Sequence, residues 1–242
     1  MGTAVIDLAL ESFFFCVAYW LNPIPRHGLI PDTAAVLFIV YPVLSNILRK
    51  SGWIRAGFDM TVLSQAARIC VIVGVPLAIT LFLLGYGKPL RLYPAGFFLT
   101  IGPWRIRLSS AYQYALLYVP LALAQQYIFM GFVWDRWRLV LGGHDLRAAF
   151  LGWFMFVAMH IPNPVLMVSA FAGWWVFFSI FRRYRNILPI AILHAVLALL
   201  VYKATFPYLP SMLVGEMYTR NERHFDPTTR SIGFNLKAAP AR

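Results

Sequence analysis

The chain alternates long apolar runs with short polar and basic stretches. A helix needs about 20 mainly apolar residues to cross a membrane, and seven runs approach or reach that length. These runs cover residues 4–21, 34–48, 63–84, 111–134, 148–160, 165–181 and 187–204. The segment 88–110 mixes apolar and basic residues and is too broken to span, so we expect it at the membrane interface. The pattern predicts an all-α protein, a polytopic transmembrane helical bundle of about seven to eight spans.

The runs follow one another without a linker long enough to separate two membrane domains, and we find no internal repeat. We therefore expect a single membrane-embedded helical domain over residues 1–205 and a polar C-terminal tail over residues 206–242. The first run lacks the basic start of a signal peptide and is interrupted by Asp7 and Glu11. It is better interpreted as a retained first span.

The composition excludes an ordinary soluble domain. The chain is 60% hydrophobic and 12% charged, whereas soluble domains are about 45–50% apolar and about 25% charged. Such a chain cannot cover itself with a polar surface, whereas lipid requires none. The two cysteines, Cys16 and Cys70, both lie in apolar runs and suggest neither a disulfide framework nor a metal cluster.

A formal net charge of +12 could suggest a nucleic-acid partner. The basic residues instead form small clusters between the apolar runs: Arg49 and Lys50, Arg136 and Arg138, Arg182, Arg183 and Arg185. Clusters at this position are typical of helix ends that meet lipid headgroups, so we expect membrane lipids as partners and no nucleic acid. The orientation in the membrane stays open. The basic loops after the second, fourth and sixth runs would lie on one side, whereas the basic residues at 88–107 and in the tail would lie on the opposite side.

Polar side chains at membrane depth are costly and mark functional sites or contacts between helices. The apolar runs contain few of them: Asp7, Glu11, Arg68, Gln125, Gln126, His160 and His194. Each also has a purely structural interpretation. His194 could bond a backbone carbonyl of a neighbouring helix, His160 could cap the last carbonyls of its own helix, and Glu11 could pair with Arg68 or stay protonated. Adjacent glutamines point about 100° apart on a helix and could each bond a different neighbour, for about 0.6–2 kcal/mol.

Three segments taken together carry a family resemblance. They are QQYIFMG at residues 125–131, FVAMHIPNP at 156–164, and His194 inside the last run. In this order and spacing they resemble the CPBP family of intramembrane proteases, which includes type 2 CAAX prenyl endopeptidases and bacteriocin-processing relatives. The family's motifs are EExxFRG, FxxxH and a histidine followed four residues later by asparagine. The resemblance covers about residues 111–200 and retains Phe129, Gly131, Phe156, His160 and His194.

The resemblance implies a catalytic site that this chain has altered. In the family a glutamate acts as general base toward water, and the histidines and asparagine orient the water or stabilise the oxyanion. Here Gln125 and Gln126 replace the two glutamates, Met130 replaces the arginine and Ala198 replaces the asparagine. A carboxamide cannot accept the proton that a general base must take. The four residues Gln125, Gln126, His160 and His194 are therefore the candidate site, in a degenerate form, with Phe129, Phe156 and Glu11 as supporting residues.

Two functions follow from this altered site. The first is a catalytically impaired homologue that acts as a binding, assembly or structural subunit of a membrane complex, or binds a lipidated or helical peptide. The alternative is an active endopeptidase with a non-standard site, in which Glu11 supplies the carboxylate or His160 and His194 hold a metal ion. We expect no metal and no cofactor, because two histidines fall short of the three protein ligands usual for catalytic zinc.

Other function classes have less support. A transporter would show paired broken helices or a repeat between its two halves, and neither is present. A purely structural bundle remains an alternative, in which the polar side chains only hold helices together. The nearly carboxylate-free runs and the basic loops suit a multi-pass protein of a bacterial inner membrane.

Overall fold

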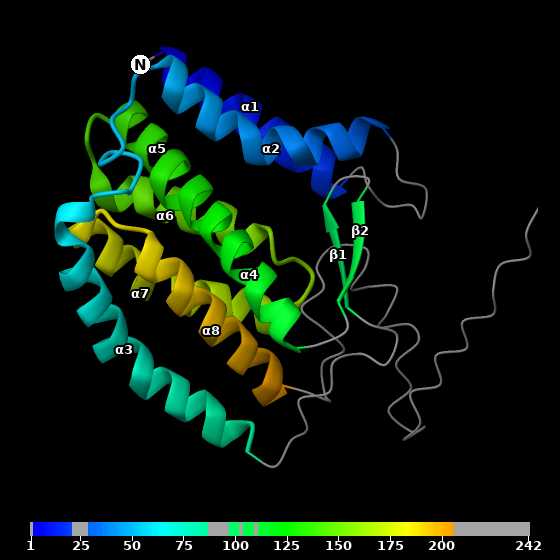
Figure 1. The fold of residues 1–242 in the computed structure, drawn as a ribbon. Coiled ribbons are helices and arrows are strands. Elements are labelled where there is room, and N and C mark those ends of the chain that lie inside the picture. Colours follow the sequence, from blue (N-terminus) through cyan, green and yellow to red (C-terminus); the bar gives the residue numbers. More distant parts are fainter. Residues whose placement is uncertain (1, 21–28, 87–96, 102–103, 109–110, 206–242) are drawn as a thin grey trace, which may run out of the picture.

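A computed structural model describes residues 2–20, 29–86, 97–101, 104–108 and 111–205 (Figure 1). The predicted C-terminal tail, residues 206–242, lies outside the described residues. The elements are α1 (Gly2–Trp20), α2 (Leu29–Leu48), the 3-10 turn η1 (Met60–Val62), α3 (Leu63–Leu84), β1 (Phe97–Ile101), β2 (Trp104–Leu108), α4 (Ala111–Gln126), the π-helix η2 (Tyr127–Val133), α5 (Trp134–Val140), α6 (Asp145–Ala158), α7 (Pro164–Tyr184) and α8 (Leu188–Thr205).

Each of the seven predicted apolar runs forms helix, so the all-α fold is confirmed. The protein is a helical membrane protein, with three helices long and apolar enough to cross a membrane among the described residues: Met60–Leu84, Pro164–Tyr184 and Leu188–Thr205. Thr33–Leu48 is a shorter apolar helix. The count of seven to eight spans stays a prediction.

The segment predicted to lie at the interface contains a small hairpin. β1 and β2 pair antiparallel, with Phe97 opposite Leu108 and Ile101 opposite Trp104. Each strand has only five residues, rich in aromatic and β-branched types that favour extended backbone. The broken apolar pattern of this segment predicted that it does not span a membrane, but no pattern in it predicted the strands. Whether the hairpin lies at a membrane interface stays a prediction.

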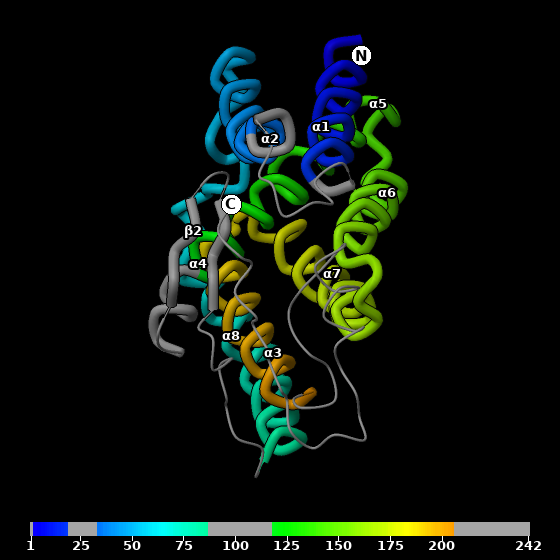
Figure 2. The backbone as a smooth tube through the Cα atoms, turned by 90° about the vertical axis from the view of Figure 1, so that its right-hand side faces the viewer, coloured from blue at the N-terminus to red at the C-terminus, as the bar shows by residue number. Residues whose placement is uncertain are grey.

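The helices form two groups. α8 lies between α3 and α4, while α1 and α2 pack against each other and reach the rest of the bundle chiefly through α5 and η2 (Figure 1). Figure 2 shows the α1–α2 pair at one end of the molecule and the far ends of α3 and α8 at the other. The third and fourth predicted runs therefore both contact the last helix, whereas the first two stand apart from it.

The helix that forms at the fourth predicted run is longer than the run and changes from α-helix to π-helix and back. α4, η2 and α5 continue directly into one another, and every residue of η2 is buried. A π-helix has a wider turn than an α-helix and is often found at functional sites. Glycine is required inside it at Gly131, because a Cβ there would collide with the backbone carbonyl oxygen of Ala56. The loop before η1 and the π-helix are thus in direct backbone contact.

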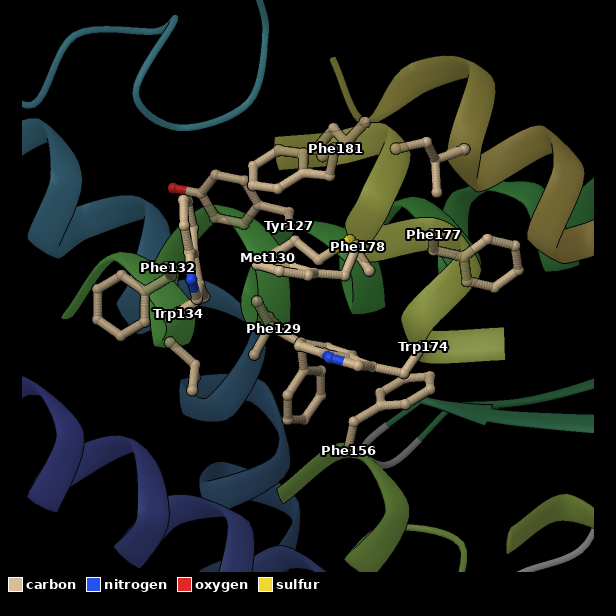
Figure 3. Packing of buried hydrophobic residues seen from close by; sticks show 14 of the residues in the cluster. Tyr127, Phe129, Met130, Phe132, Trp134, Phe156, Trp174, Phe177, Phe178 and Phe181 are labelled. Carbon is tan, nitrogen blue, oxygen red and sulfur yellow. The ribbon is translucent and has the colours of Figure 1, made fainter. Parts of the chain in front are cut away.

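An aromatic core surrounds η2 (Figure 3). The edge of the Phe129 ring meets Phe156 with centroids 5.3 Å apart, and Trp174 stacks parallel to Phe178 with centroids 6.0 Å apart. α6 ends before the Pro-rich turn as predicted, and Asn163 begins α7 by accepting a hydrogen bond from the backbone N–H of Leu166. This packing places Phe156, at the end of α6, between the two histidines.

Candidate functional site

The glutamine pair and the last helix meet through one buried hydrogen bond. Gln126, the last residue of α4, donates from Nε2 to Nδ1 of His194 on α8 over 2.9 Å. Both side chains are buried, with exposed fractions of 2% and 9%. Because Nδ1 accepts, the hydrogen of the neutral His194 ring lies on Nε2. The alternative that His194 bonds a backbone carbonyl does not hold at Nδ1, where the side-chain amide of Gln126 is the partner.

His160 has the opposite tautomer. Its Nδ1 donates to the backbone carbonyl oxygen of Phe156 over 2.7 Å, four residues earlier, so it caps its own helix as predicted. A carbonyl oxygen can only accept, so Nδ1 carries the hydrogen and Nε2 keeps a free lone pair. The ring of Phe156 lies 5.0 Å from that of His160 and 6.2 Å from that of His194, centroid to centroid. The site therefore combines one imidazole N–H donor and one imidazole acceptor beside the same phenyl ring.

Gln125 directly precedes Gln126 near the end of α4. It is half-buried, and its Oε1 is buried without a hydrogen-bond partner among the described residues. A buried carbonyl oxygen without a partner is costly, so this oxygen is available for a ligand or water that reaches it. Phe129, one helical turn later, lies in the core against Phe156. The structure thus brings Gln126, Phe129, Phe156 and the two histidines to one place.

The sequence profile of the family described as type II CAAX prenyl endopeptidase Rce1-like matches residues 107–200. These residues include all three motif segments, the helices α4 to α7 and most of α8. This part of the chain is therefore similar to the CPBP family. No curated protein and no solved structure gives a significant match to it.

Glu11 stands apart from the CPBP site. It is fully buried in α1, and neither carboxylate oxygen has a hydrogen-bond partner among the residues that the structure describes. No hydrogen bond or ion pair joins it to Gln125, Gln126 or either histidine within the described part of the chain. The predicted pair with Arg68 is wrong: Arg68 is exposed on α3, which packs along α7 and α8 rather than on α1.

The CPBP site offers few ligands for a metal ion. No group of three or more His, Cys, Asp or Glu side chains gathers within the described ranges. His160 and His194 could each offer one nitrogen, but in the tautomers that their Nδ1 hydrogen bonds require, only Nε2 of His160 carries a lone pair that is not already bonded to Gln126. A metal at this site would therefore require His194 to release its bond with Gln126.

A charged network between α1, α2 and α5 escaped the sequence analysis. Asp7 accepts hydrogen bonds from Tyr41 Oη, Arg49 Nη2 and Arg136 Nε, each over 2.7 Å. Asp7 and Arg136 are almost completely buried, with side-chain exposures of 0% and 2%. The expectation that Arg136 meets lipid headgroups is wrong, because its guanidinium turns inward to a carboxylate 129 residues earlier in the chain.

Asn46 extends this network to the π-helix. Its Oδ1 accepts from Arg136 Nη2 over 2.6 Å, and its Nδ2 donates to Tyr127 Oη over 2.7 Å. Tyr127 in turn donates to the carbonyl of Pro42 over 3.2 Å. One amide on α2 therefore holds both the first residue of η2 and the helix that follows it. Asp7, an acidic residue inside an apolar run, was a sequence signal for such a network. The pattern of apolar positions does not identify which residues pair with it.

Proposed function

We propose that this CPBP homologue does not cleave peptides and acts by binding, as a subunit of a complex in a bacterial inner membrane that it crosses several times. The observation that supports this proposal is the hydrogen bond between Gln126 and His194. In that arrangement an amide occupies the position of a family glutamate and donates its hydrogen to the histidine. A glutamate in the same place would accept a hydrogen bond and could accept a proton from water.

The motif has lost its negative and its positive charges together. Met130 stands at the family's arginine position and is buried, with 1% exposure. An unpaired charge at a buried position is strongly unfavourable. Loss of the glutamates without loss of the arginine would leave such a charge, whereas this chain has lost both signs together. The joint loss preserves the packed helices and removes the general base.

The remaining polar atoms suit recognition of a peptide backbone. Gln125 Oε1 has no donor among the described residues, and Nε2–H of His194 can donate to an acceptor. An amide of an extended or unwound peptide supplies one of each. Phe156 and Phe177 pack against His194, so a peptide that reached this histidine would meet aromatic side chains beside it.

A cleavage assay tests the proposal directly. The purified natural chain is reconstituted in vesicles with a farnesylated CAAX-type peptide and with a leader-type peptide. It is compared with a variant that carries Gln125→Glu, Gln126→Glu, Met130→Arg and Ala198→Asn. A matched control, Gln65→Glu, adds a carboxylate on the exposed face of α3.

The natural chain and the control should leave both peptides intact, and the restored variant should cleave at least one above the background of empty vesicles. Robust cleavage by the natural chain would overturn the proposal. The subunit role is tested separately by purification in mild detergent. A stoichiometric membrane partner supports it, and an isolated monomer counts against it.

One observation favours the alternative of an active endopeptidase. Nε2 of His160 has a free lone pair, because Nδ1 is held by the carbonyl of Phe156. An imidazole in this tautomer can act as a general base without a carboxylate. If the natural chain cleaves either peptide, His160→Gln should abolish that cleavage, and His160 rather than Glu11 is then the base.

A further inference from the structure

The turn between α7 and α8 lies at a membrane surface. Both helices are long and apolar enough to cross the membrane, and only residues 185–187 join them. The loop before η1 packs on this turn: the backbone N–H of Asp59 donates to the carbonyl of Arg185 over 3.0 Å, and that of Ile187 donates to Gly57 over 2.8 Å. The loop and the turn therefore form one surface.

This surface exposes apolar side chains next to basic ones. Trp53 is 68% exposed and Ile54 is 57% exposed. Arg55 follows them directly, and Arg49 and Lys50 precede them. Tryptophan is enriched where a protein meets the headgroup layer of a membrane. The surface is therefore built to contact lipid rather than bulk water alone.

Arg185 forms the inner wall of this surface. It is a non-glycine residue in the left-handed region, with φ of 48°, and its guanidinium lies 4.3 Å from the ring centroid of the buried Trp134. Arg138 approaches the same ring, with 5.7 Å between its guanidinium carbon and the ring centroid. One terminal nitrogen of Arg185, Nη1, is buried and has no hydrogen-bond partner among the residues that the structure describes.

The neighbouring carboxylates are already engaged. Asp135 pairs with Arg55 and Arg136, each over 3.1 Å. Asp145 pairs with Arg138 over 2.7 Å and lies 3.5 Å from Arg182. No ion pair joins Arg185 to either carboxylate within the described residues.

Asp59, whose backbone adjoins Arg185, uses its carboxylate to cap η1 through Thr61. Burial lowers the pKa of Arg185 from its usual value and repulsion from Arg138 adds to that effect, while attraction from Asp135 and Asp145 opposes it. Arg185 is thus a partly buried cation that forms no direct ion pair within the described residues.

We propose that Arg185, together with Arg138 and Arg55, binds the phosphate group of an anionic membrane lipid. Guanidinium groups bind phosphate oxygens through paired N–H donors, and a partly desolvated cation gains most from such a partner. The exposed Trp53 and Ile54 favour a lipid as the source of the phosphate, because they place acyl-chain contacts beside the cationic group.

The side of the membrane follows from the same residues. Arg49 donates to the carbonyl oxygen of Thr3 over 3.0 Å, so the chain's N-terminal end lies near this basic end of the bundle. Basic residues are enriched at cytoplasmic ends of membrane helices, and anionic lipids are enriched in the cytoplasmic leaflet. The site therefore faces the cytoplasm and draws its lipid from the inner leaflet. This inference does not depend on whether the chain cleaves peptides.

The test measures lipid binding by the full chain in mild detergent, using native mass spectrometry with phosphatidylglycerol and phosphatidylcholine. The variants are Arg185→Gln and Arg55→Gln. The matched control is Arg147→Gln, which removes an exposed charge on α6. The natural chain should prefer phosphatidylglycerol. Arg185→Gln should weaken that binding about tenfold, the size expected for a lost charge-assisted hydrogen bond, while Arg147→Gln should leave it unchanged.

The competing outcomes are separable. Equal binding of the two lipids, normal phosphatidylglycerol binding by both variants, or an equal loss in Arg147→Gln would each overturn the proposal. Displacement of the lipid by millimolar inorganic phosphate would identify a soluble phosphate as the ligand and would overturn the lipid assignment. If Arg185→Gln does not fold, Arg55→Gln decides, because its side chain is 47% exposed and its loss leaves the Trp134 wall in place.

Discussion

Removal of the Asp7 carboxylate should be among the most damaging single changes in the first helix pair. Asp7 accepts three hydrogen bonds of 2.7 Å, from Tyr41, Arg49 and Arg136. Asp7→Ala would leave the guanidinium of Arg136 buried with only Asp135 as its counter-charge. The change would also release α1 from its neighbours, because Tyr41 lies on α2, Arg49 directly follows α2 and Arg136 lies on α5.

The expected cost can be worked from burial. Asp7 and Arg136 are 0% and 2% exposed, and removal of one partner from a buried ion pair costs about 3–5 kcal/mol. For a protein of this size, 1 kcal/mol shifts the unfolding midpoint by about 2–4 °C, so a shift of roughly 6–20 °C follows. Asp145→Ala is the matched control, because its pairs are partly exposed and such pairs contribute about 0–1 kcal/mol.

The assay is thermal unfolding in mild detergent, followed by tryptophan fluorescence. The double variant Asp7→Ala, Arg136→Met should recover part of the loss, because the fully buried guanidinium is then gone and Arg49, which also loses Asp7, is partly exposed. A midpoint shift for Asp7→Ala no larger than that for Asp145→Ala would refute the reasoning. So would a double variant that is less stable than the sum of the two single changes.

Two further changes test the π-helix and the site. Gly131→Ala should lower stability by about 1–3 kcal/mol in the same assay, because the new Cβ meets the carbonyl of Ala56, which cannot rotate away; an unchanged midpoint would contradict this contact. Gln126→Leu should lower the free energy of unfolding by about 1–3 kcal/mol, because it leaves Nδ1 of His194 buried without a donor. Gln125→Leu should be close to neutral, because the Oε1 that it removes has no partner among the described residues. Equal effects of the two leucine changes would contradict the assigned bond.

The positions of the helices were predictable from the chain alone. A run of apolar residues is a local property, and helix is the structure that satisfies its backbone in lipid. The third run matches α3 at both ends, Leu63 and Leu84. The fourth run was predicted as one helix, but the chain changes to a π-helix after Gln126 and back to an α-helix at Trp134. The wider turn depends on close contacts with other segments, such as that of Gly131 with Ala56, which no local pattern contains.

The sequence by itself determined which residue types can do chemistry at the site: two amides and two imidazoles in family order, with no carboxylate at the motif positions. Only the tertiary structure decided their partners. It paired Gln126 with His194, gave the two histidines opposite tautomers, separated Glu11 from Arg68 and joined Asp7 to Arg136. The reason is that a hydrogen bond or ion pair depends on the distance between two atoms, and helices far apart in the chain acquire that distance only when they pack.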